Sequence, residues 1–126
     1  MKTISSPDAP AALGPYSQAI THNGVVYCSG QIGLLPNGQW AGDDASSQAK
    51  QVLANLAAVL LAASSRPENV IRSTVFLASM DDFSAVNEVY ADFFGSHRPA
   101  RACIEAKRLP KDALVEISVI ATTDLE

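Results

Sequence analysis

The chain has 126 residues, of which 48% are hydrophobic and 17% charged, and its formal net charge is −4. This length is typical of one domain, so we expect a single domain over residues 1–126. No apolar run is long enough to cross a membrane, and an acidic chain without a basic cluster is poorly suited to neutralising phosphates. The composition therefore predicts a globular protein with neither a membrane nor a nucleic-acid partner.

The first ten residues contain one lysine and no apolar stretch after it. This is unlike a secretory leader or an organelle transit peptide, so we expect a cytoplasmic protein. The two cysteines, Cys28 and Cys103, are then expected to be reduced thiols. Neither cysteine lies at the spacing from other Cys or His residues that is typical of a metal site, so we expect no metal.

Strand and turn signals dominate the first 40 residues. The segments 16–21 and 25–32 flank an Asn-Gly pair, which is a strong hairpin signal between two strand-like runs. A second Asn-Gly pair, beginning at Asn37, predicts another turn. A short third strand fits after this turn, before Asp43 or Asp44 caps the helix that follows.

Two helices and three further strands are expected after this point. Apolar residues at three- and four-residue steps predict amphipathic helices over 46–65 and 80–95. Between them, β-branched residues predict a strand over 70–78, and two more strands are expected over 101–106 and 114–121. The simplest packing is a single mixed sheet with both helices on one face, which is an α+β fold of two layers.

The last two strands predict a sheet face without a cover. In 114–121, alternate residues form an apolar set suited to a helix layer, whereas Glu116 falls on the other face. Arg101, Cys103 and Glu105 share one face of their own strand, and we expect it to be the same uncovered face as Glu116 if the strand pairing aligns them. Such a face is too apolar for bulk water, so we predict a homo-oligomer.

Five blocks of sequence resemble the Rid family (YjgF/RidA), and specifically its RidA branch. In chain order they are LGPYSQA, CSGQIG, VNEVYADFF, PARACIE and RLPKDALVEI. The resemblance implies a chorismate-mutase-like α+β fold and a homotrimer with ligand sites in the clefts between subunits. It also implies hydrolysis of reactive enamines and imines, such as 2-aminoacrylate and 2-imino acids, to 2-keto acids and ammonia. No metal or cofactor is implied, and the activity would protect against metabolite damage.

The resemblance also implies roles for individual residues. Arg101 would bind the substrate carboxylate, and Glu116 would activate water or transfer a proton. The other implied pocket contacts are Tyr16, Ser29, Gly30, Asn87, Cys103 and Pro110. The two main roles agree with residue chemistry, because a guanidinium gives a carboxylate two parallel charge-assisted hydrogen bonds and a partly buried carboxyl can move protons.

Structural interpretations of the same residues stay open at this point. Glu116 fits an ion pair with Arg101 across the sheet as well as a catalytic role. Cys103 has no histidine in its motif, which favours a pocket wall over a nucleophile. Asn87 also fits a buried hydrogen bond, and Tyr16 also fits an amphipathic core position.

Two other function classes compete with a deaminase. One is a module that binds 2-keto acids or other small carboxylates without turnover, for which Glu116 is not required. The other is ribonuclease activity or inhibition of translation, functions attached to relatives of this family. The net charge of −4 argues against the second class.

Overall fold

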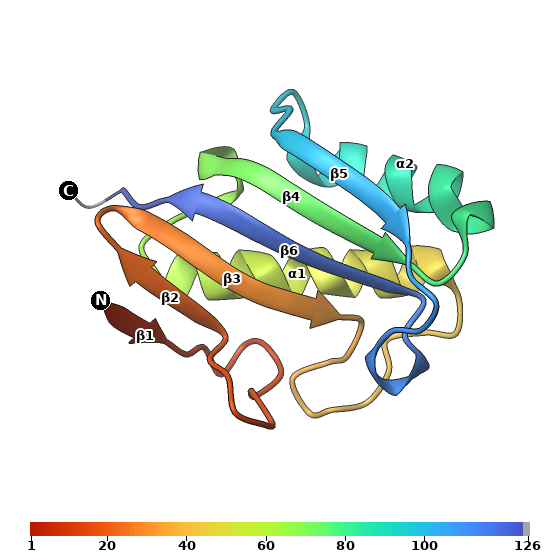
Figure 1. Cartoon of the computed structure of the whole chain (residues 1–126), viewed down its shortest axis with the longest axis horizontal. Helices are drawn as coiled ribbons and strands as arrows, with labels where there is room; N and C mark the ends of the chain where they lie inside the picture. Colours follow the sequence, from red (N-terminus) through yellow and green to blue (C-terminus); the bar gives the residue numbers. More distant parts are fainter. Residues whose placement is uncertain (125–126) are drawn as a thin grey trace.

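A computed structural model describes residues 1–124, in which one six-stranded sheet carries two α-helices against one face (Figure 1). The elements in chain order are β1 (Lys2–Ile4), β2 (Ala19–His22), β3 (Val25–Ile32), α1 (Ala45–Ala62), η1 (Pro67–Asn69), β4 (Val70–Leu77), η2 (Met80–Asp82), α2 (Phe83–Phe94), β5 (Ala100–Glu105), η3 (Pro110–Asp112) and β6 (Val115–Thr122). The strands lie in the order β1-β2-β3-β6-β4-β5, and only β4 and β5 are parallel neighbours among them. The α+β fold with a single mixed sheet is confirmed.

Local signals account for most of these elements. The β2–β3 hairpin turns at Asn23 and Gly24, whose φ angles of 51° and 76° lie in the left-handed region that such tight hairpin turns require. Asp44 caps α1 by accepting a hydrogen bond from the Ser47 N–H at 2.7 Å. The expected third strand is wrong, because Leu34 and its bridge partner after the turn form only an isolated β-bridge.

The core lies between the sheet and the two helices. One face of α1 contributes fully buried apolar residues such as Val52, Leu53 and Leu56. Burying a side chain of this size contributes about 1.5–3 kcal/mol, so the α1 face is a major source of stability. In β6 the residues alternate as predicted, with Val115 and Ile117 among those buried beneath the helices.

The pairing of β4 with β5 corrects one expectation from the sequence. The parallel register places Arg101 beside Ser73 and Cys103 beside Val75. Ser73 and Val75 are 0% and 2% exposed, on the sheet face that the helices cover. Arg101, Cys103 and Glu105 therefore do share a face with one another, but it is the helix side and not the face of Glu116.

The opposite face of the sheet has no helix over it (Figure 1). Tyr27 on β3 and Ile104 on β5 are 48% and 50% exposed there, which confirms the predicted uncovered face. Within residues 1–124, no helix combines the length and apolar character needed to cross a bilayer.

Candidate functional site

A cavity of about 630 Å³ lies at the end of the sheet where several loops meet. Figure 1 shows the loop before β2, the loop after β3 and the loop before β6 gathered at this end. The cavity wall combines residues 10–13, Tyr16, Gln18, residues 29–32, Leu34, residues 36–38, Pro110, Lys111 and Glu116. The wall is mainly apolar, with a few polar groups, as is typical of small-molecule sites.

A β-bulge in β3 brings backbone to the cavity. The β3–β6 register shifts between Cys28 and Gln31, so that one extra β3 residue is accommodated and Ser29 and Gly30 line the cavity. Two hydrogen bonds hold Ser29 there, one from its N–H and one from its hydroxyl. The N–H donates to the Gln18 carbonyl at 2.9 Å. That hydroxyl donates to the Ser17 carbonyl at 2.6 Å.

Gly30 leaves the space that Glu116 occupies. A Cβ atom at residue 30 would lie 2.6 Å from the Glu116 Oε2 atom, a separation that real Cβ contacts do not show. Glycine is therefore the residue that lets the carboxylate lie against the β3 backbone.

Glu116 is a partly buried carboxyl in the cavity wall. Burial raises its pKa above the usual range of a glutamate. Within residues 1–124 the ion pairs are Arg66–Asp124 and Arg108–Asp112, and neither hydrogen bonds nor ion pairs in this range hold the Glu116 carboxylate. Within one chain, Glu116 is therefore not the ion-pair partner of Arg101, since the two side chains lie on opposite faces of the sheet.

Arg101 is preorganised by aromatic rings on α2. Its guanidinium carbon lies 4.8 Å from the ring centroid of Tyr90 and 5.8 Å from that of Phe83. Its Nη1 atom donates to Asn87 Oδ1 at 2.8 Å. Tyr90 is itself fixed, because its hydroxyl hydrogen-bonds to the buried Ser73 hydroxyl at 2.8 Å. The guanidinium is thus oriented while remaining exposed to a ligand.

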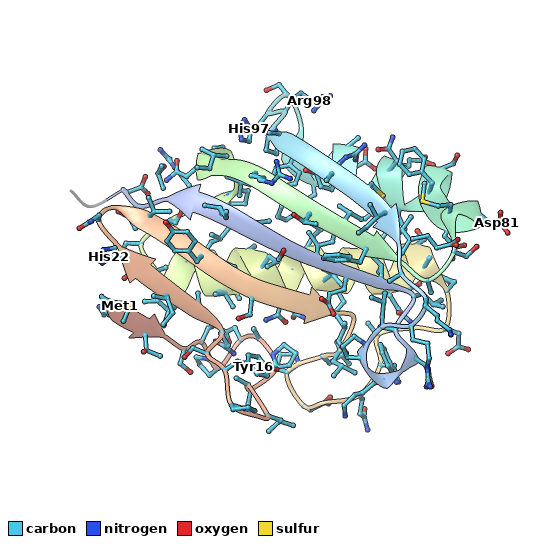
Figure 2. The ribbon with its side chains drawn as sticks, in the orientation of Figure 1. Met1, Tyr16, His22, Asp81, His97 and Arg98 are labelled. Atoms are coloured by element: carbon cyan, nitrogen blue, oxygen red, sulfur yellow. The ribbon has the colours of Figure 1, made fainter. Side chains whose placement is uncertain are left out.

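The remaining predicted residues lie in one or other of these clusters. Tyr16 is 54% exposed on the loop that joins β1 to β2 (Figure 2), so it lines the cavity and is not a core tyrosine. Asn87 bonds Arg101 and not a buried core group. Burial raises the pKa of the Cys103 thiol, which disfavours the nucleophilic thiolate and supports a packing role.

The structure therefore divides the predicted residues between two places. The cavity group is Tyr16, Ser29, Gly30, Pro110 and Glu116. The second group, Arg101 with Asn87 and Cys103, lies on the helix side of the edge strand β5 and its neighbour α2. Within one chain these two groups do not form one continuous site.

Sequence reasoning missed three residues that organise these groups. Gln18 is 3% exposed and holds the chain before β2, since its Oε1 accepts from the Ser6 N–H at 2.6 Å and its Nε2 donates to the Pro10 carbonyl at 2.8 Å. Phe83 and Tyr90 are the other two, and both pack against the core from α2. Their helical spacing from Asn87 was the one available signal for a shared role. Among residues 1–124, no three His, Cys, Asp or Glu side chains lie together as a metal would require.

The fold and the cavity define a class: a small two-layer α+β protein with one uncovered sheet face and one carboxyl in an apolar pocket. Residues 6–123 match the family model described as endoribonuclease L-PSP. The chain belongs to this family, which is the Rid family that the sequence motifs indicate.

Individual relatives resemble the chain over nearly its whole length. The 2-iminobutanoate/2-iminopropanoate deaminase of Bos taurus is 46% identical over 121 residues, which cover 95% of this chain and 88% of the relative. A protein of the endoribonuclease L-PSP type from Entamoeba histolytica has a TM-score of 0.94 at 52% identity, over 96% of this chain and 98% of that one. Escherichia coli TdcF with bound serine has a TM-score of 0.94 at 38% identity, over 98% and 100% of the two chains.

Proposed function

We propose that this protein hydrolyses reactive enamines and imines, such as 2-aminoacrylate and other 2-imino acids, to 2-keto acids and ammonia. The observation that carries the proposal is the Glu116 carboxyl, whose pKa is raised by burial in a cavity of mainly apolar wall. A 46% identical relative that is named as a 2-iminobutanoate/2-iminopropanoate deaminase supports the substrate class. A raised carboxyl pKa suits a group that must both give and take protons near neutral pH.

One carboxyl is sufficient for the proton transfers. Protonated Glu116 gives its proton to the methylene carbon of 2-aminoacrylate, which converts the enamine into the electrophilic iminium form. The resulting carboxylate then takes a proton from water as the water oxygen bonds to the imine carbon. Return of that proton to the nitrogen lets ammonia leave while the carbon–oxygen double bond forms, and the hydroxyl proton of the tetrahedral intermediate passes to the Glu116 carboxylate. One water is consumed, and Glu116 is protonated again as at the start.

Arg101 supplies the anchor for the substrate carboxylate in this proposal. The guanidinium is planar, permanently charged and oriented by Asn87 and Tyr90, so little side-chain freedom is lost when a carboxylate binds. In TdcF, a small carboxylate, serine, is the bound molecule. Cys103 and Pro110 would act as walls of the site, and Tyr16, Ser29, Gly30 and Asn87 as polar or backbone contacts.

We further propose that the site is completed in a homotrimer, in clefts between subunits. Arg101 lies at the β5 edge and Glu116 in the cavity, so a second copy is needed to bring a guanidinium to the carboxyl. The uncovered sheet face with Tyr27 and Ile104 is the surface available for such an association. We also propose a cytoplasmic location, where two free thiols such as Cys28 and Cys103 stay reduced.

The other two function classes are less well supported. A module that only binds 2-keto acids has no need for a carboxyl with a raised pKa beside the ligand. Ribonuclease activity requires phosphate contacts, and a chain of net charge −4 offers few of them.

Coupled turnover tests the proposal directly. A serine dehydratase generates 2-aminoacrylate, and the release of pyruvate is followed with and without this protein. We expect acceleration above the spontaneous rate that is proportional to protein concentration. Release at the spontaneous rate would show that the protein is not a deaminase of this substrate.

A further inference from the structure

The turn η3, which enters β6, contains two successive residues in the left-handed region. Lys111 has a φ of 56° and Asp112 a φ of 58°. Glycine adopts this conformation without steric cost, whereas a lysine rarely does. Lys111 and the preceding Pro110 line the cavity. Unfavourable backbone conformations gather at functional sites, where the surrounding structure enforces them.

The surroundings of Lys111 enforce its backbone conformation from both sides. Leu109 and Ala113 flank the turn and are 8% and 1% exposed. The Asp112 N–H donates to the Leu109 carbonyl at 3.0 Å, and the Ala113 N–H donates to the Pro110 carbonyl at 3.1 Å. The turn therefore carries a long cationic side chain at a position where glycine would be the less strained choice.

The charge of Lys111 is left available to a ligand. The neighbouring Asp112 carboxylate is occupied by Arg108, whose Nη2 and Nε atoms lie 2.7 and 3.2 Å from Oδ1. Within residues 1–124, no side-chain hydrogen bond or ion pair engages the Lys111 ammonium. Lys111 and Glu116 are the charged residues in the described cavity wall, so the wall holds one cation.

We propose that Lys111 is a second contact for the substrate carboxylate, which attracts 2-imino and 2-keto acids to the cavity and orients them together with Arg101. The inference rests on the proposed function, because it takes the cavity as the place where these acids bind. The two cations would act differently. Arg101 gives paired, directional hydrogen bonds, whereas the flexible, exposed ammonium of Lys111 acts mainly as a point charge at the rim.

The test is calorimetric titration with 2-ketobutyrate at low and high ionic strength. Lys111→Gln keeps most of the side-chain length without the charge, and Lys111→Gly removes the charge at a backbone position that suits glycine. We expect both to raise Kd about 3- to 10-fold at low salt, as for a partly exposed charge contact, and we expect the difference to shrink in about 0.5 M salt. Lys111→Arg should bind within about twofold of the wild type, since the positive charge is retained.

Lys107→Gln is the matched control. Lys107 is an exposed lysine of the same connecting segment and does not line the cavity. Its replacement changes the net charge equally, so it should leave Kd within about twofold of the wild type. In the coupled assay, Lys111→Gln should raise KM while kcat stays near the wild-type value.

Three results would overturn the role of Lys111. The first is wild-type binding by Lys111→Gln at low salt, which would make Lys111 an ordinary solvated lysine. The second is a loss of 2-ketobutyrate affinity in Lys111→Gly but not in Lys111→Gln, which would show a backbone effect and not a charge effect. The third is a titration in which the wild-type protein does not bind 2-ketobutyrate at all. The proposed function fails separately: keto-acid binding that depends on Lys111, without faster pyruvate release, would refute the deaminase and retain the contact.

Discussion

Replacing Glu116 with glutamine separates proton transfer from binding. Glutamine has nearly the same shape as glutamate, so it fits the space that Gly30 leaves. It cannot exchange protons near neutral pH, and loss of a general acid–base commonly lowers the rate by about 10²- to 10⁴-fold. We expect a loss of turnover in this range, with the Kd for 2-ketobutyrate changed little.

The free energy of unfolding should not fall in this variant. Burial raises the pKa of Glu116, so the folded state binds its proton more strongly than the unfolded state does. The wild type therefore loses stability as the pH rises from the usual carboxyl pKa to the raised value, and at neutral pH it carries the cost of a buried charge. Glu116→Gln lacks this cost, so it should be at least as stable as the wild type at pH 7 in chemical denaturation.

The pH profile provides an independent readout of the same group. Because Glu116 must be protonated to convert the enamine into the iminium form, kcat/KM should fall as the pH rises through its pKa, and this basic limb should lie above the usual glutamate range because burial raises the pKa. The limb should be absent from the residual activity of Glu116→Gln. Spontaneous hydrolysis of 2-aminoacrylate must be subtracted at each pH.

Glu105→Gln is a suitable control for this experiment. Glu105 is also a strand carboxyl, but it accepts a hydrogen bond from the Met80 N–H at 2.8 Å at the start of η2, away from the cavity. A glutamine oxygen can accept the same bond, so activity should be retained. Wild-type turnover by Glu116→Gln would refute the catalytic role of the carboxyl, whatever the behaviour of the control.

Three further outcomes are expected. Arg101→Ala should weaken 2-ketobutyrate binding about 30-fold or more, or about 2 kcal/mol, and lower turnover with it; calorimetry showing unchanged affinity would place the carboxylate anchor elsewhere. Gly30→Ala should reduce turnover, because the added Cβ would lie 2.6 Å from Glu116 Oε2, and an unimpaired variant in the coupled assay would contradict this geometry. Light scattering at micromolar concentration should report about three times the chain mass of 13.3 kDa, whereas the mass of one chain would exclude the proposed trimer.

Local features of the fold could be predicted from the sequence. The Asn23-Gly24 turn, the cap at Asp44 and the alternation along β6 all depend on the conformations and contacts of near neighbours, and the structure has all three. The strand β1 could not be predicted, since Lys2–Ile4 is too short to carry a pattern and is a strand only through its pairing with β2. The motifs also indicated five residues that line the cavity, which the structure brings together from separate loops and strands.

The tertiary structure alone decided which sheet face each functional residue occupies. Alternation in a strand determines that Arg101 and Cys103 share a face, but the identity of that face depends on the neighbouring strand and on its direction. The parallel pairing with β4 places Arg101 beside buried Ser73, on the helix side, whereas antiparallel pairing with β3 and β4 directs Glu116 to the cavity. The residue types that are present for carboxylate binding and proton transfer follow from the sequence alone. Within one chain, strand pairing places Arg101 and Glu116 on opposite faces of the sheet. This separation could not be predicted from the sequence, because long-range pairing follows from the packing of the whole sheet and not from any local pattern.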